Sequence, residues 1–145
     1  MEDSAERLQF SISSSFENVA DLAEQVSEAC GTRTGQQADA TDMLRLCLAE
    51  ALNNIVEHAY SGADGKPIFA DVSFTDHGYE VLLIDEGKPM PGGVAPDGEM
   101  EFEIDDLENL PEGGFGWMLI RTEMDKVDYE RRAGCNVLRL EKHIT

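Results

Sequence analysis

The feature that most constrains the fold is a long helical pattern over residues 38–60. Apolar side chains recur there every three or four positions and would form one buried stripe, made of Leu44, Leu48, Ala51, Leu52, Ile55 and Ala59. Along the edge of that stripe, Glu50, Asn54 and His58 follow one another at intervals of four residues. A polar line of this kind is usually a solvated helix edge, so it indicates chemistry only if other parts of the chain provide partners for it.

The segment before this helix predicts a strand followed by another helix. Residues 8–12 alternate apolar and polar side chains, as half-buried strands do. Ser14 and Glu17 have the spacing of a capping box and predict the helix start, and Gly31 predicts its end. The buried stripe of this helix would comprise Phe16, Val19, Leu22, Ala23, Val26 and Ala29.

The segment after the long helix predicts two hairpins and a short helix. Residues 68–74 and 79–84 would pair as antiparallel strands, and the second would be buried on both faces because its sequence is almost continuously apolar. A helix is expected over residues 117–124 and a second hairpin over residues 126–142. The predicted fold is an α+β two-layer sandwich, with helices on one face of a mixed, mostly antiparallel sheet.

Composition limits what such a domain can bind. The 145 residues fit a single domain, 1–145, and their formal net charge is −19. A surface this acidic repels phosphate backbones and anionic lipids, so direct nucleic-acid binding and membrane binding are disfavoured. The acidity is densest in residues 94–112, which contain eight acidic residues and no basic one. We expect that stretch to form a solvated loop.

The sequence offers no candidate for a membrane span, a signal peptide or a structural metal site. The N-terminus is acidic, whereas a signal peptide begins with basic residues. The three cysteines, Cys30, Cys47 and Cys135, are odd in number and none is paired at the spacing of zinc ligands. These features favour a reduced, cytoplasmic protein.

Three separated features could combine into one site. Glu50 and Asn54 offer a carboxylate that can accept a proton and a carboxamide oxygen that suits Mg²⁺. Asp85 ends the buried strand and could accept a hydrogen bond from an exocyclic amine, while Gly87 would let a flat base approach the backbone. The glycine-rich stretch 114–116 opens the third helix, whose free N–H groups and dipole suit a phosphate.

Taken singly, each of these features has a simpler explanation. A Glu and an Asn four apart are usually a solvated edge, and an Asp-x-Gly after a strand is usually a turn. A glycine-rich stretch before a helix is more often a hinge than a phosphate cradle, and this one lacks the Lys-Ser/Thr of a P-loop. Their order along the chain, at a helix, a strand end and a helix start, is what favours one common site.

Together these residues resemble the motifs of the GHKL ATPases. The N box, in the form found in anti-sigma-factor serine kinases, is matched by Glu50-Ala51-Leu52-Asn53-Asn54. The adenine-binding box is matched by Asp85-Glu86-Gly87, and the second glycine box by Gly114-Phe115-Gly116-Trp117. The resemblance extends from the first predicted strand to the last and implies a Bergerat-type ATP-binding fold.

The resemblance implies a role for each residue of the first two boxes. Asn54 would hold the Mg²⁺ that bridges the phosphates of ATP, and Glu50 would be the general base that deprotonates the substrate hydroxyl. Asp85 would accept a hydrogen bond from the adenine amino group, and Gly87 would give the base room.

The same resemblance implies which residues bind the phosphates, which form the lid and which help to hold the adenine. Gly114, Phe115 and Gly116 would bind the phosphates, and residues 88–113 would form the ATP lid. The family commonly has Gly-Thr near the start of the last strand, where the threonine helps to hold the adenine. This chain has Gly134-Cys135-Asn136 there, so Cys135 or Asn136 would take the threonine's place.

The function implied is that of a protein serine/threonine kinase that phosphorylates a STAS-domain anti-sigma antagonist. The same domain would bind a sigma factor, which as a DNA-binding protein is a plausible basic partner for the acidic lid. The second and third helices could also serve a homodimer. The alternative is a non-catalytic anti-sigma regulator that binds its partner with or without nucleotide. Glu50 favours the kinase, because a pure binding protein needs no base at that position.

Overall fold

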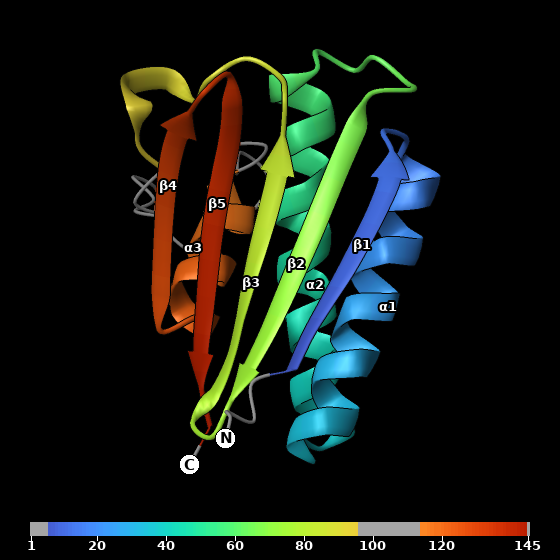
Figure 1. Ribbon diagram of the computed structural model, residues 1–145, viewed down its shortest axis with the longest axis vertical. Coiled ribbons are helices and arrows are strands. Elements are labelled where there is room, and N and C mark those ends of the chain that lie inside the picture. Colours follow the sequence, from blue (N-terminus) through green and yellow to red (C-terminus); the bar gives the residue numbers. More distant parts are fainter. Residues whose placement is uncertain (1–5, 96–113, 145) are drawn as a thin grey trace, which may run out of the picture.

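In the part of the chain that the structure describes, three α-helices cover one face of a five-stranded sheet (Figure 1). The structure is a computed structural model that describes residues 6–95 and 114–144. The strands are β1 (Glu6–Ser13), β2 (Pro67–Thr75), β3 (Gly78–Asp85), β4 (Lys126–Arg132) and β5 (Cys135–His143). The helices are α1 (Phe16–Thr34), α2 (Ala38–Asn54) and α3 (Gly114–Glu123). A π-helical turn, Ile55–Ala59, continues α2, and a 3₁₀ turn, Pro91–Gly93, follows β3.

The sheet confirms the α+β sandwich but corrects the prediction of a mixed sheet. The strand order is β1-β2-β3-β5-β4, and all four pairings between described strands are antiparallel. Two pairs are direct hairpins, β2-β3 and β4-β5. Between β1 and β2 the chain passes through two successive helices, which return it to the end that it left, so β2 runs back along β1.

The ends of α1 differ from those predicted. The N-cap is Ser15, whose side chain accepts a hydrogen bond from the Asn18 N–H at 3.0 Å. Ser14 is buried instead, where its hydroxyl donates to the Ala63 carbonyl at 2.6 Å and accepts from the Lys66 N–H at 3.0 Å. The helix ends at Thr34, and Gly35, with φ of 72°, closes it through a bond to the Gly31 carbonyl.

Gly31 therefore lies inside α1 and serves a different purpose. A Cβ atom at this position would lie 2.6 Å from the Thr41 Oγ1 atom, so glycine allows α1 and α2 to approach closely. The predicted buried stripe of α1 is confirmed from Val19 to Val26, but Phe16 is 52% exposed.

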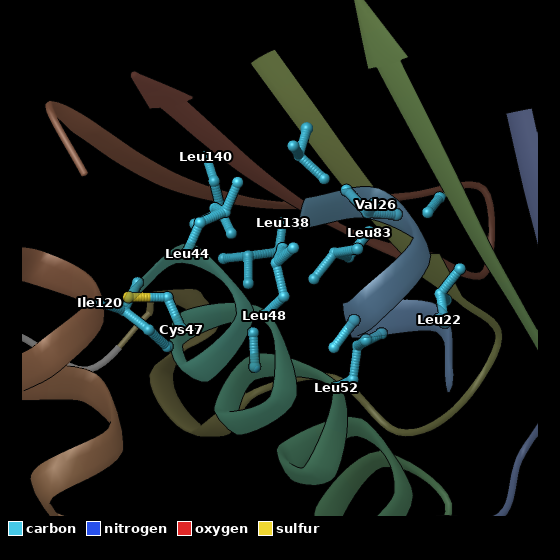
Figure 2. Close-up of a cluster of buried hydrophobic side chains, with 14 of the residues drawn as sticks. Leu22, Val26, Leu44, Cys47, Leu48, Leu52, Leu83, Ile120, Leu138 and Leu140 are labelled. Atoms are coloured by element: carbon cyan, nitrogen blue, oxygen red, sulfur yellow. The ribbon is translucent and has the colours of Figure 1, made fainter. Parts of the chain in front are cut away.

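The core lies between α2 and the central strands. Figure 2 shows Leu44, Leu48 and Leu52 of α2 facing the strand side chains, which include Leu83, Leu138 and Leu140. In β3 the inward side chains Tyr79, Val81 and Leu83 are buried, whereas the alternate residues are half-buried. The prediction that both faces of this strand are buried is thus wrong, since the described helices cover only one face. Over the described ranges, no helix is both long and apolar enough to cross a membrane.

Candidate functional site

A cavity of about 630 Å³ lies at the end of the sheet where β3 finishes. Its polar lining includes Asn54, His58, Asp85, Lys88 and Asn136, and its apolar lining includes Ile55, Met90, Trp117 and Leu138. Its size and mixed lining are typical of small-molecule sites. A larger groove, of about 740 Å³, is lined by His77 and His143 and contains none of the predicted site residues. We therefore take the cavity beside β3 as the candidate site.

Asp85 supplies the buried acceptor that the sequence predicts. Its side chain is at the cavity wall, and only 3% of the residue is exposed. The Oδ1 atom accepts two hydrogen bonds, from the Gly87 N–H and from Asn136 Nδ2, each at 2.8 Å. Among the described residues the Oδ2 atom has no hydrogen-bond partner. Burial raises the pKa of Asp85, while the bonds from Asn136 and Gly87 and the charge of Arg131 oppose that rise.

Gly87 has a packing role that the sequence did not predict. A Cβ atom at this position would lie 2.4 Å from the Ala59 carbonyl oxygen, and the next residue, Lys88, donates its N–H to the same carbonyl at 2.9 Å. The loop after β3 thus rests directly on the π-helical turn, and no side chain fits between them. The predicted role of giving a base room remains a prediction.

Asn54 and Glu50 lie one turn apart at the end of α2. Asn54 Nδ2 donates to the Glu50 carbonyl at 2.9 Å, which fixes the amide and leaves Oδ1 without a partner among the described residues. Asn54 lines the cavity, so this oxygen fits the hard-cation ligand that the sequence predicts. The π-helical turn follows directly, and such turns are frequent at functional sites.

Glu50 lies beside the start of α3 rather than in the cavity lining. A Cβ atom on Gly116 would lie 2.6 Å from Glu50 Oε2, so the glycine and the carboxylate are in contact. The structure therefore brings the first and third motifs together. Gly114 is the first residue of α3, as the phosphate-binding role requires, but the side chain of Phe115 lies outside the described residues. Most of the predicted lid, residues 88–113, also lies outside them.

Of the two residues considered for the threonine's place, Asn136 occupies the cavity wall. It is 4% exposed and hydrogen-bonds to Asp85. Cys135 is only partly buried, starts β5 opposite Arg132 and is not in the cavity lining. Successive residues of a strand point to opposite faces, so an inward Asn136 turns Cys135 away from the site.

Three residues around the site have contacts to which the sequence analysis assigned no role. The Tyr60 hydroxyl donates to the Pro67 carbonyl at 2.5 Å and accepts from the Glu86 N–H at 2.7 Å. On β4, the Tyr129 hydroxyl donates to Asn136 Oδ1, and Arg131 donates to the same oxygen at 3.0 Å. The alternation along residues 127–131 could have placed Tyr129 and Arg131 on one face, but the pairing of β4 with β5 that brings them to Asn136 is not visible in the sequence.

Comparisons with known proteins agree with this geometry. Residues 12–142 match the family model of the histidine kinase-like ATPase domain. The serine/threonine-protein kinase BtrW of Bordetella bronchiseptica is 33% identical over 100 residues, which cover 69% of this chain and 68% of the relative. The serine-protein kinase RsbW of Bacillus cereus is 28% identical over 134 residues, covering 92% and 82%. RsbW of Listeria monocytogenes (serotype 4b, strain F2365) is 29% identical over 108 residues, covering 74% and 69%.

Together with the match to this family model, the described helices on one face of a sheet and the cavity at its end define an ATPase-type nucleotide-binding domain. The chain belongs to the histidine kinase-like ATPase family, and its relatives include the serine/threonine-protein kinase BtrW and the serine-protein kinase RsbW. This membership confirms the predicted family and enzyme class, a kinase that binds ATP.

Proposed function

We propose that the chain is an ATP-dependent protein serine/threonine kinase that phosphorylates a STAS-domain anti-sigma antagonist and also binds a sigma factor. The observation that carries the proposal is the meeting of three motifs at one end of the sheet. Asp85 and Asn54 line one cavity, and Glu50 lies one helical turn from Asn54 in contact with Gly116. The named activity of BtrW and RsbW supports the same reaction.

The cavity would hold the base and sugar of ATP. The adenine amino group would donate to the free Oδ2 of Asp85, and the apolar walls at Ile55, Trp117 and Leu138 suit a flat ring. A Mg²⁺ ion bound by Asn54 Oδ1 would neutralise charge on the phosphates. The N–H groups at Gly114, Phe115 and Gly116, in the first turn of α3, would bind the phosphates.

Glu50 would act on the substrate protein. Its carboxylate would take the proton from a serine or threonine hydroxyl, whose oxygen bonds to the γ-phosphorus as the bond to the β–γ bridging oxygen breaks and ADP leaves. Glu50 is only partly buried at the edge of α2, so a partner protein would reach it from that side, as this reaction needs.

The remaining partners belong to the same proposal. A sigma factor binds DNA and would therefore present a basic surface, with which the net charge of −19 would favour association. We also propose a homodimer. From the sequence alone, the second and third helices are the expected dimer surface, but the surface that supports a dimer better is an apolar row on the outward face of the sheet, where the pairing register aligns Phe69, Ile84 and Val137. Such a regulator would act in the cytoplasm, together with the sigma factor.

A transfer assay with γ-labelled Mg-ATP and a panel of STAS-domain proteins tests the proposal. We expect the wild type to label a serine or threonine of one panel member. Glu50→Gln should slow transfer by about 100-fold or more without changing ATP affinity, because only proton removal is lost. Glu57→Gln, a change to an exposed carboxylate of the π-helical turn, is the matched control and should transfer normally.

Two results would go against this assignment. Equal transfer by the wild type and Glu50→Gln would remove Glu50 from the reaction. Tight binding of a sigma factor without transfer to any STAS-domain protein would favour the alternative, a non-catalytic anti-sigma regulator.

A further inference from the structure

We propose that Tyr129 and Arg131 of β4 are positioning residues for nucleobase recognition, which they control through Asn136 without contacting the nucleotide. The inference rests on the proposed function, in which Asp85 accepts a hydrogen bond from the adenine amino group. It adds a cluster of residues on β4 and β5. These residues determine which oxygen of Asp85 faces the base, and they keep that oxygen a hydrogen-bond acceptor. We call Tyr129, Arg131 and Asn136 the β4–β5 clamp.

The Asn136 amide is saturated by protein groups. Its Nδ2 atom donates to Asp85 Oδ1 and to the Lys88 carbonyl, each at 2.8 Å. Its Oδ1 atom accepts from the Tyr129 hydroxyl and from Arg131. Two donated and two accepted bonds use the full capacity of a carboxamide. Asn136 therefore has no polar atom left for a ligand, and its effect on the base passes through Asp85.

The partners of Asn136 allow only one orientation of its amide. A reversed amide would place its oxygen against the Asp85 carboxylate and the Lys88 carbonyl, and its NH₂ group against Arg131. The Tyr129 hydroxyl accepts from the Met90 N–H at 3.0 Å, which directs its own proton to Asn136. The clamp thus fixes the donor end of Asn136 toward Asp85.

Arg131 also ties the clamp to the loop after β3. It donates to the Gly87 carbonyl at 2.6 Å, two residues beyond Asp85. Together with the bonds from Asn136 to Lys88 and from Met90 to Tyr129, this contact holds residues 87–90 against β4 and β5. The loop that carries Gly87 therefore has a fixed position relative to Asp85.

The consequence is a defined acceptor at the base. With Oδ1 occupied by two donors, Oδ2 is the atom that Asp85 offers to the cavity. An ionised carboxylate accepts from an exocyclic amine and repels a carbonyl oxygen in the same place, so the site would select adenine over an oxo-purine. The charge of Arg131 favours the ionised form of Asp85 against the effect of burial. Among the described residues, the other titratable groups that line this cavity or interact with this carboxylate are Glu86, Tyr60, Tyr129, His58 and Lys88.

Calorimetric titration with Mg-ADP and with the ADP analogue that lacks the exocyclic amino group tests the inference. The ratio of the two affinities isolates the bond to Asp85. We expect the wild type to prefer ADP, and Arg131→Met to bind ADP about tenfold more weakly with little change for the analogue, so that the ratio falls. As the pH is lowered, Arg131→Met should also lose ADP at a higher pH than the wild type, because its Asp85 protonates earlier.

Two further variants provide a matched control and a second test. Arg132→Met removes the same charge from the neighbouring residue, which pairs with Glu130 and lies on the other face of β4, and should match the wild type. Tyr129→Phe removes one hydroxyl and should lower the affinity ratio in the same direction as Arg131→Met.

Each outcome decides between the inference and its alternatives. An unchanged affinity ratio in both Arg131→Met and Tyr129→Phe overturns the inference. An equal loss for ADP and the analogue also overturns it, since that result would mean a structural role only. A wild type that binds ADP no better than the analogue instead overturns the proposed role of Asp85, on which the clamp depends.

Discussion

At the residue scale, the two glycines of the site are constrained by different neighbours. A Cβ atom on Gly87 would meet the backbone carbonyl of Ala59 at 2.4 Å, whereas one on Gly116 would meet the end of the Glu50 side chain at 2.6 Å. The backbone of a packed turn cannot move away from an added Cβ atom, whereas a carboxylate on a rotatable side chain can. An alanine substitution should therefore lower the stability of the fold at Gly87 and slow phosphoryl transfer at Gly116.

We expect Gly87→Ala to lower the free energy of unfolding by about 1–3 kcal/mol, the cost typical of overpacking. Gly116→Ala should leave stability within about 1 kcal/mol of the wild type, since alanine is the better helix former. It should nevertheless slow phosphoryl transfer, because Glu50 has to move. Urea unfolding and the transfer assay measure the two effects. Full transfer activity in Gly116→Ala would show that the position of Glu50 is not critical.

The cysteines should differ in reactivity according to their burial. Desolvation raises the pKa of Cys30 and of Cys47 to about 12, so at pH 8 both are almost entirely in the unreactive thiol form. Cys135 is only partly buried. We expect iodoacetamide at pH 8 to modify Cys135 first in the native protein, and all three after unfolding in urea. Mass spectrometry of the labelled peptides checks this order, and early labelling of Cys47 would contradict it.

The candidate site residues proposed from the sequence belong to compact motifs. Asn54 and Asp85 lie at one cavity because each motif fixes its own place, at the end of a helix or of a strand. Tyr129 and Arg131 could not be predicted in the same way. Their role depends on the register that sets them opposite Leu138 and Asn136, and a one-residue shift of that register would turn them to the other face.

At the element scale, α1 shows how tertiary contacts select between local signals. The run Ser13-Ser14-Ser15 contains two possible caps, and the capping-box spacing favoured Ser14. Ser14 instead hydrogen-bonds to Ala63 and Lys66, residues about fifty positions away, and Ser15 is the N-cap. Gly31 likewise predicted a helix end. The structure instead requires glycine at this position because Thr41 of α2 approaches too closely for a side chain.

The cap predicts a specific loss of stability. Ser15→Ala should lower the free energy of unfolding by about 1 kcal/mol, because the Asn18 N–H loses its acceptor at the first turn of α1. Ser15→Asp, which keeps an acceptor there, should retain most of the stability. Chemical denaturation of the three proteins measures the difference. Equal stability of Ser15→Ala and the wild type would mean that another group caps the N-terminus of α1.

At the scale of the whole molecule, the layers could be predicted and the strand order could not. Hydrophobic periodicity predicted helices on one face of a sheet, which the structure confirms (Figure 1). Nothing local shows that β5 rather than β4 pairs with β3, yet this pairing sets Asn136 opposite Asp85 and so completes the site. The candidate site is therefore a product of the assembled sheet as well as of its motifs.

The central claim is that Asp85 anchors a nucleotide in the cavity beside β3. Thermal unfolding of the wild type and of Asp85→Asn, each with and without Mg-ATP, tests it most directly. ATP at about a hundred times its dissociation constant adds roughly 2.7 kcal/mol to the free energy of unfolding, which raises the melting temperature by about 9 °C at this chain length. We predict this shift for the wild type and its loss in Asp85→Asn. An equal shift in both proteins would place the nucleotide elsewhere, and no shift in either would contradict the claim.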